Sequence, residues 1–348
     1  MEPSKLQPSQ IPYPPRISLA QLPTPLTHLA RASKRWGCGK RLWVKRDDLT
    51  GSTLTGNKVR KLEFFTAHAR EHGYSSLITC GGLQSNHARA TAGVCAQLGL
   101  HCELILRGRA PLEGGNTLLD GLFGARVTTV EPREYVTNLD ALLAAAAERH
   151  RQQGYKPLVI PTGGSNGLGI WGYIAGAEEL IRDMECASIE KALVVCATGS
   201  GGTQAGLTAG FSLLSPKSHV LGMAVCDDED YFCQKVQEDM AEVKADWPAL
   251  DCAPERILTN DSYIGEGYGL AGPEVYKLIF ELASLEGVVL DPVYTGKAFY
   301  GLITELDKGE YPDTDDIIFV HTGGVFGIFP HEQGLREAMH ESGQPPPA

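Results

Sequence analysis

The sequence lacks several patterns that would each point to a particular class of protein. No apolar run approaches the roughly 20 residues that a membrane-spanning helix needs, and no apolar leader segment follows Lys5. The nine cysteines include no CxxC pair, and together with the ten histidines they never cluster at ligand spacing. These absences argue against a disulfide framework and against a zinc site of the usual spacing. We therefore expect a cytoplasmic protein without a metal.

Positive charge is also scarce. Lysine and arginine number 31 against 42 acidic residues, which leaves a net charge of -11. Such a chain has little with which to neutralise a phosphate backbone. Two nucleotide-binding loops are missing as well, because no Lys-Ser/Thr pair follows the glycines of residues 199–202 and Gln204 stands where a GxGxxG loop ends in glycine. We expect neither nucleic acid nor a membrane among the partners.

What is present is a regular alternation of short apolar runs with helix-like segments. Apolar strands that alternate with helices are typical of parallel sheets covered on both faces, so the sequence predicts an α/β fold. A chain of 348 residues is long for a single core, and two lobes are expected. The predicted strands are residues 76–80, 102–106, 126–130, 157–160, 192–196, 220–225 and 317–320.

Chemically distinctive residues follow some of these strands, where parallel sheets place their ligands. Lys58 follows the tight Gly56-Asn57 turn, just before a predicted helix. A single lysine is usually a surface residue. Here it is accompanied by a hydroxyl and amide cluster at 85–87 and a glycine-rich turn at 199–203. An amine nucleophile with these two elements is what a protein needs to hold pyridoxal phosphate as a Schiff base.

Each of the other motifs also has a purely structural interpretation. Ser85 is a plausible helix N-cap, which is a common role for serine, but with Asn86 and His87 it also predicts a carboxylate site at the helix N-terminus. The turn at 199–203 is either a tight packing turn or a phosphate site. Tyr268 is either a core residue with a satisfied hydroxyl or part of a cleft wall. Residues 291–297 and 320–324 are expected to be two more turns at strand ends.

Six motifs, in order along the chain from about residue 15 to about 335, carry a family resemblance. They are KRDDLT (45–50), GNKVRKLE (56–63), QSNH (84–87), GGTQAG (201–206), DPVYTGK (291–297) and HTGG (321–324). The chain resembles the D-cysteine desulfhydrase/1-aminocyclopropane-1-carboxylate (ACC) deaminase family. This family is a branch of the tryptophan-synthase-β-like pyridoxal-phosphate enzymes, called fold type II.

The resemblance implies a fold, a cofactor and a set of site residues. It implies two three-layer α/β/α lobes with the cofactor in the cleft between them. Residues 1–57 with 168–348 would form the large cofactor-binding domain and residues 58–167 the small one. Lys58 would carry pyridoxal phosphate, and Asn86 would contact its 3-hydroxyl. The phosphate would be held by Gly199, Ser200, Gly201, Gly202 and Thr203.

The substrate, a small amino acid, would contact a second set of residues. Its carboxylate would be received by Ser85, Asn86 and His87. Tyr268 and Tyr294 would face it, and the two tyrosines would act in catalysis together with Lys58 and Ser85. We expect Lys58, or a tyrosinate in its place, to remove the Cα proton, and Tyr294 or Tyr268 to protonate the departing sulfur. The resemblance also implies a homodimer.

Two further positions near the cofactor separate the activities within this family. ACC deaminases have glutamate at the position of Thr295, close to the pyridine nitrogen, and leucine at that of Thr322. A glutamate keeps the pyridine protonated and makes it a strong electron sink, which suits opening of a cyclopropane. Threonine supports a weaker sink, which suffices to expel sulfide. Both residues therefore favour β-elimination from D-cysteine, giving pyruvate, hydrogen sulfide and ammonia.

Other activities stay open at this stage. The same scaffold can act as a lyase or a β-replacement enzyme on another β-substituted amino acid, such as cysteate, β-chloroalanine or serine. ACC deaminase is disfavoured by Thr295 and Thr322. A protein that binds the cofactor without turnover is disfavoured because Lys58, Ser85 and Tyr294 are all present. The chirality of the substrate is not readable from the chain, so the D-preference rests on the resemblance alone.

Overall fold

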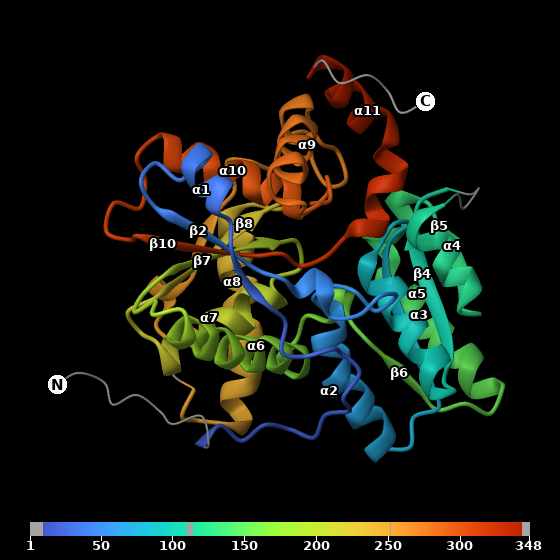
Figure 1. The fold of residues 1–348 in the computed structure, drawn as a ribbon. Coiled ribbons are helices and arrows are strands. Elements are labelled where there is room, and N and C mark those ends of the chain that lie inside the picture. The colour runs from blue at the N-terminus through green and yellow to red at the C-terminus, as the bar shows by residue number, and fades with distance from the viewer. Residues whose placement is uncertain (1–9, 110–113, 251, 343–348) are drawn as a thin grey trace.

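The computed structural model describes residues 10–109, 114–250 and 252–342. Two separate β-sheets organise them, and helices pack around each sheet (Figure 1). The larger sheet has the strand order β1-β2-β10-β7-β8-β9, in which only β1 runs antiparallel to its neighbour. Its strands are β1 (Leu26–His28), β2 (Arg41–Lys45), β7 (Leu193–Thr198), β8 (His219–Ala224), β9 (Leu258–Asn260) and β10 (Asp316–Val320).

The smaller sheet is parallel throughout, with the order β5-β4-β3-β6. Its strands are β3 (Ser76–Gly82), β4 (His101–Arg107), β5 (Arg126–Val130) and β6 (Pro157–Val159). The helices are α1 (Ala30–Trp36), α2 (Lys58–Glu71), α3 (Asn86–Leu98), α4 (Gly115–Leu122), α5 (Pro132–Gln152), α6 (Gly167–Cys186), α7 (Gly202–Leu214), α8 (Glu229–Asp246), α9 (Pro273–Glu286), α10 (Thr295–Asp307) and α11 (Glu332–Glu341). Short 3₁₀ turns occupy Asp47–Leu49, Thr162–Gly164, Pro254–Arg256 and Val325–His331.

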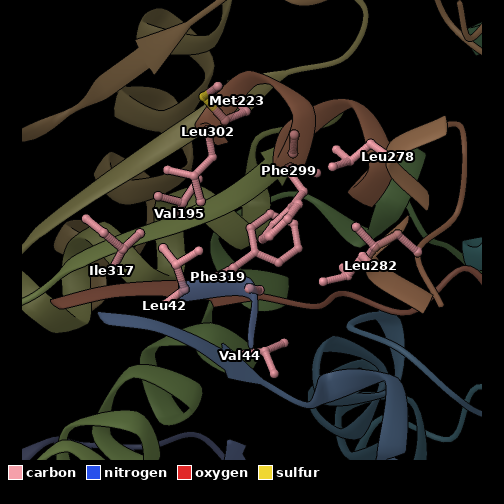
Figure 2. Close-up of a cluster of buried hydrophobic side chains, with 14 of the residues drawn as sticks. Leu42, Val44, Val195, Met223, Leu278, Leu282, Phe299, Leu302, Ile317 and Phe319 are labelled. Carbon is pink, nitrogen blue, oxygen red and sulfur yellow. The ribbon is translucent and has the colours of Figure 1, made fainter. Parts of the chain in front are cut away.

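Both faces of the larger sheet are buried, and alternate residues of each strand serve the two faces. Val195 and Phe319 point into a core shared with α9 and α10, where the rings of Phe299 and Phe319 meet edge to face at 5.1 Å (Figure 2). The intervening residues, such as Val194 and Ile318, pack against α6 and α7 on the other face. This two-sided burial is why the strands read as continuous apolar runs in the sequence.

The predicted α/β fold with mostly parallel sheets is confirmed, and all seven predicted strands are present within a few residues of their expected bounds. Three strands were missed. β1 and β9 are only three residues long, and β2 is masked by its charged ends. Lys45 of β2 is 2% exposed because it is paired with Glu179 and Asp183, so a buried strand carries a residue type typical of the surface.

Two local expectations were wrong. Lys58 is the first residue of α2 and does not precede that helix. Residues 291–297 were expected after a strand, but residues 288–290 form no strand, and the segment is instead a turn that opens α10. The division into domains at residues 57 and 167 stays a prediction. Within the residues that the structure describes, no helix is long and apolar enough to cross a membrane.

Candidate active site

A cavity of about 790 Å³ opens where the carboxyl ends of β3, β4, β7, β8 and β10 face the beginning of α2. This is where parallel sheets place their ligands. Eleven of the predicted site residues line it: Lys58, Ser85, Asn86, His87, Gly199, Ser200, Gly201, Thr203, Tyr268, Tyr294 and Thr322. The other two predicted residues, Gly202 and Thr295, are buried but are not part of this lining.

Lys58 places its amine in the cavity wall. It is the first residue of α2, and its amine forms no hydrogen bond or ion pair with any residue that the structure describes. A side chain at Gly163 would bring its Cβ within 3.3 Å of the Lys58 Nζ atom, so the loop at 162–164 approaches the amine with bare backbone. Burial lowers the pKa of Lys58 to about 8, because a buried site disfavours the charged form. The amine is therefore reactive close to neutral pH.

The position of α2 is set by a buried ionic network. Arg60, two residues beyond Lys58 and 2% exposed, donates to both oxygens of Asp47 at 2.8 Å and to Glu179 of α6 at 2.9 and 3.0 Å. Tyr173 also donates to Asp47 at 2.6 Å. Such networks contribute more to geometry than to net stability, since dehydrating the charges is costly. This one holds the start of α2 against α6 and the 3₁₀ turn that follows β2.

The N-terminus of α3 presents donors to the cavity. Ser85 caps the helix, as predicted, and its Oγ accepts from the Ala88 N–H at 3.2 Å. The hydroxyl hydrogen of Ser85 is thereby left to donate elsewhere. Residue 81 has to be glycine here, because a Cβ on Gly81 would lie 2.5 Å from the Ser85 Oγ atom. A capped helix start with a free hydroxyl suits a carboxylate.

The ring of His87 is held by a hydrogen bond to Thr79. The Thr79 hydroxyl donates to the Ile160 carbonyl at 2.8 Å, so it must accept from the His87 Nε2–H at 2.9 Å. Burial, with the charges of Lys58 and Lys61, lowers the pKa of His87 well below its usual value, so the ring is neutral. Its buried Nδ1 atom has no hydrogen-bond partner among the described residues and carries a lone pair in this tautomer. A carboxylate role for His87 stays a prediction, and it would use the backbone N–H.

Asn86 is held by residues that the sequence did not single out. Arg89 donates to the Asn116 Oδ1 atom at 3.0 Å, and Asn116 in turn donates to the Asn86 Oδ1 atom at 3.0 Å. This relay fixes the orientation of the Asn86 amide and turns its NH₂ group away from Asn116. The sequence carried no signal for the roles of Asn116 and Arg89, because Asn116 lies in α4 whereas Asn86 and Arg89 lie in α3.

The turn between β7 and α7 is organised by Ser165. The Ser165 Oγ atom accepts from the Lys61 ammonium at 3.0 Å and from the Gly202 N–H at 3.2 Å, so its own hydrogen goes to the Ser200 Oγ atom at 2.9 Å. Ser200 is then left with a hydrogen to donate into the cavity. Gly202 lies against this arrangement, since a Cβ there would come within 2.7 Å of the Lys61 Nζ atom.

Lys61 is a second buried lysine beneath the same turn. Its ammonium also donates to the Gly163 carbonyl at 3.1 Å. Burial and the neighbouring Lys58 lower the pKa of Lys61 well below its ordinary value. A nearby anion would favour its charged form. Thr203 completes the turn by accepting from the Asn57 amide at 3.0 Å, which leaves the Thr203 hydroxyl hydrogen available. These donors, at a helix N-terminus, suit a phosphate.

Two tyrosines form another part of the cavity wall. Tyr268 and Tyr294 are hydrogen-bonded through their hydroxyls, with the rings in a T-shaped arrangement. Burial raises the pKa of both hydroxyls, and the mutual contact raises that of Tyr294 further. Both tyrosines are therefore protonated at neutral pH. The cleft-wall interpretation of Tyr268 agrees with this placement.

Thr295 and Thr322 have different surroundings. Thr322 lines the cavity, whereas the Thr295 hydroxyl donates to the Asp291 Oδ1 atom at 2.7 Å. Asp291 in turn accepts from the N–H groups of Val293, Tyr294 and Thr295 at the start of α10. Thr295 therefore stabilises the turn that carries Tyr294. Its predicted role in cofactor binding stays a prediction.

Comparison with known proteins decides the family. The family model of pyridoxal-phosphate dependent enzymes matches residues 17–323. The chain belongs to this family. A Klebsiella pneumoniae protein named D-cysteine desulfhydrase is 42% identical over 92% of this chain and 97% of its own. A Thermotoga maritima protein named putative 1-aminocyclopropane-1-carboxylate deaminase is 40% identical over 92% of this chain and 99% of its own.

Solved structures agree with this assignment of the chain to the pyridoxal-phosphate dependent enzymes. An ACC deaminase homologue superposes with a TM-score of 0.84 at 35% identity, covering 93% of this chain and 96% of that one. Threonine deaminase isoform 2 from Solanum lycopersicum, at a TM-score of 0.63 and 15% identity over 92% of this chain and 84% of that one, shows the same fold. The resemblance found in the sequence and the cofactor that it implied are therefore confirmed.

The cavity fits pyridoxal phosphate. It offers a buried amine without a partner at Lys58, and hydroxyl donors with a lysine at the helix start that would take the phosphate. The Thr198 Oγ atom at the end of β7 is buried, lines the cavity and has no hydrogen-bond partner among the described residues. A polar atom of this kind normally has a partner, and a bound group would supply one. These observations agree with the predicted place of the cofactor between Lys58 and the turn at 199–203, which stays a prediction.

Proposed function

We propose that this chain catalyses α,β-elimination on a β-substituted amino acid, with D-cysteine and water converted to pyruvate, hydrogen sulfide and ammonia. Relatives named for desulfhydrase and for deaminase are almost equally identical to it, so identity does not separate the two activities. The observation that carries the proposal is that threonine occupies both positions 295 and 322, where ACC deaminases have glutamate and leucine. The Thr295 hydroxyl is bonded to Asp291, and Thr322 faces the cavity.

The residues of the chain have distinct roles in this reaction. Pyridoxal phosphate, when bound, withdraws electrons from the substrate Cα atom and so makes its proton acidic. Ser85 and the backbone at the start of α3 bind the substrate carboxylate and orient the Cα–H bond. The Lys58 amine accepts the Cα proton, for which a pKa of about 8 is well matched. The hydroxyl pair of Tyr268 and Tyr294 donates a proton to the departing sulfur.

The positions of these residues in the cavity wall support separate roles for the proton acceptor and the proton donor. Lys58 and Tyr294 both line it, on segments that come from α2 and from the turn before α10. The acceptor of the Cα proton and the donor to the sulfur are thus separate groups. Because the pKa of Tyr294 is raised well above its ordinary value, this tyrosine acts as an acid and not as a base at neutral pH.

One experiment tests the proposal directly. The visible absorption of the protein purified with pyridoxal phosphate is recorded while D-cysteine is added, and released pyruvate is assayed in the same cuvette. The expected result is a visible band that shifts, with pyruvate and sulfide appearing together. A band that shifts without pyruvate would move the activity to another leaving group or to β-replacement. Parallel assays with L-cysteine, D-serine and ACC decide among the alternatives.

A further inference from the structure

Arg107 is a charged residue of the cavity to which the proposed reaction gives no role. It ends β4, directly beside Gly82 of β3 in the register of the smaller sheet, and it lines the cavity. Its guanidinium lies over two aromatic rings, 5.3 Å from the centroid of Tyr268 and 5.7 Å from that of Tyr135. Contacts of this kind stabilise a cation and restrict the orientation of its plane. Arg107 is therefore a preoriented cation beside the proposed proton donor.

This cation has no counter-ion in the part of the chain that the structure describes. No hydrogen bond or ion pair joins the guanidinium to any residue in 10–109, 114–250 or 252–342. Two other charged groups of the lining are engaged, since Lys235 pairs with Asp239 and Glu242 accepts from the Gly167 N–H at 2.7 Å. A half-buried charge normally has a partner. Within a chain of net charge -11, an arginine that pairs with no carboxylate among the described residues is a specific arrangement.

The anions already assigned to the cavity are placed elsewhere. The cofactor phosphate is assigned to the turn at 199–203, and the substrate α-carboxylate to the start of α3 at Ser85. Arg107 lies one strand beyond that carboxylate site, on the side of Tyr268. Tyr268 is also one of the two groups that we propose protonate the leaving sulfur. The guanidinium is thus beside the position of the leaving group.

We propose that Arg107 binds a negatively charged β-substituent of the substrate, so that the site prefers acidic β-substituted alanines to neutral ones. The flat guanidinium matches two oxygens of a sulfonate or carboxylate. The inference rests on the proposed elimination and adds a substrate class to it, of which cysteate is the simplest member with a leaving group. Cysteate and water would give pyruvate, ammonia and sulfite. The Cα proton goes to Lys58, and the electron pair of the Cβ–S bond leaves with sulfite.

Two other roles for Arg107 predict different measurements. If the guanidinium bound the substrate α-carboxylate, every amino acid would depend on it equally. If it only stabilised the two rings, its loss would lower the melting temperature without changing preference among ligands. The ratio of the Kd values for an acidic and a neutral ligand therefore distinguishes the proposed role from the other two.

A binding experiment that does not depend on turnover tests this ratio. Calorimetry gives Kd values of the protein with bound pyridoxal phosphate for aspartate, which mimics the anionic substituent, and for alanine, with both enantiomers of each. We expect aspartate to bind at least about 10-fold tighter than alanine, as for an ion pair that is partly shielded from water. Arg107→Met is expected to remove most of that preference, and Arg107→Lys to restore part of it.

A matched control and a kinetic measurement complete the test. Arg109→Met removes a nearby arginine whose side chain is 79% exposed and paired with Glu131, and it should leave the ratio unchanged. In kinetics, Arg107→Met should lower the ratio of kcat/KM for cysteate to that for β-chloroalanine by at least about 10-fold. The inference is overturned if Arg107→Met weakens the binding of aspartate and of alanine equally. It is also overturned if the unmodified protein shows no preference for aspartate over alanine.

The outcomes also separate this inference from the proposed function. If D-cysteine, cysteate and β-chloroalanine all fail to yield pyruvate, the proposed elimination is wrong, and the aspartate-to-alanine ratio still decides the role of Arg107. If pyruvate forms while the ratio does not respond to Arg107→Met, the elimination stands and the preference for acidic substrates is refuted. The melting temperature and visible spectrum of each variant show that fold and cofactor are retained.

Discussion

Tyr268 and Tyr294 meet hydroxyl to hydroxyl in the cavity wall, with ring centroids 5.8 Å apart and planes inclined by 72°. Tyr268 comes from the loop after β9, and Tyr294 from the turn that opens α10. Since both pKa values are raised by burial, one hydroxyl donates to the other and a single O–H remains for a third group. The pair therefore presents one shared proton to the cavity.

Removing either hydroxyl should slow the reaction while leaving the walls of the cavity intact. Tyr294→Phe and Tyr268→Phe keep the ring contact, so we expect kcat for D-cysteine to fall by roughly 10²–10⁴-fold with a smaller change in KM. Steady-state kinetics with sulfide detection measures this. Tyr231→Phe, at the cavity rim and 47% exposed, is the control. A loss confined to KM would contradict a role in proton transfer.

Lys58 is expected to be indispensable for holding the cofactor. Lys58→Ala should abolish both turnover and the visible absorption band, because the other lysine of the described lining, Lys235, is paired with Asp239. Lys34→Ala, on the exposed face of α1, should change neither. Retention of turnover by Lys58→Ala would refute the assignment, whereas loss of turnover with the visible band intact would move the covalent link to Lys61.

Capture of the cofactor should follow the protonation of Lys58. Its pKa of about 8 leaves roughly a tenth of the amine neutral at pH 7, against fewer than about one in a thousand for an ordinary lysine. Only the neutral amine attacks an aldehyde. The rate at which protein freed of cofactor captures pyridoxal phosphate should therefore rise with pH up to about 8 and then level off. A rate still rising tenfold per pH unit at pH 9 would contradict the lowered pKa.

The balance between elimination and ring opening is expected to depend on two positions. Thr295→Glu combined with Thr322→Leu should lower D-cysteine turnover and raise turnover of ACC relative to it, because a carboxylate near the pyridine strengthens the electron sink. Thr295→Gln with Thr322→Leu is the uncharged control for the disturbance of Asp291, which Thr295 contacts. An unchanged ratio of the two activities in the Glu variant would contradict this account of specificity.

Asp47 should be important for stability as well as for the placement of Lys58. Asp47→Ala leaves Arg60 buried with only Glu179 as a carboxylate partner, and we expect a loss of roughly 3–5 kcal/mol. Glu148→Ala, which removes an ion pair exposed on both sides, should cost about 1 kcal/mol or less. Thermal melts of both variants check the difference. Equal effects would mean that burial of the Arg60 pair is unimportant.

The same carboxylate predicts a pH dependence. Burial alone would raise the pKa of Asp47, but Arg60, Tyr173 and Lys45 outweigh burial, and the pKa lies below its ordinary value. A lowered pKa contributes stability that is present above the unfolded value of about 3.9 and is lost as the pH falls through the folded value. The difference in melting temperature between the unmodified protein and Asp47→Asn should therefore shrink below about pH 4.

Much of the fold and part of the site followed from the sequence, for reasons that are local. Strands such as β7 and β10 are buried on both faces, so their apolar runs are visible without a structure. Lys58, Ser85 and the turn at 199–203 occupy strand-end or helix-start motifs whose chemistry depends on neighbours in the chain. The family resemblance rested on such contiguous motifs, and the comparisons confirmed it.

Other features were decided only when distant segments met. Lys45 looked like a surface residue, but Glu179 and Asp183 of α6 allow it to be buried in β2. The orientation of Asn86 depends on Asn116, thirty positions along the chain. The tautomer of His87 is set by Thr79, and the hydroxyl of Ser200 by Ser165. Hydrogen bonds and ion pairs act over a few ångströms whatever the sequence separation, so only tertiary structure could show which donors face the cavity.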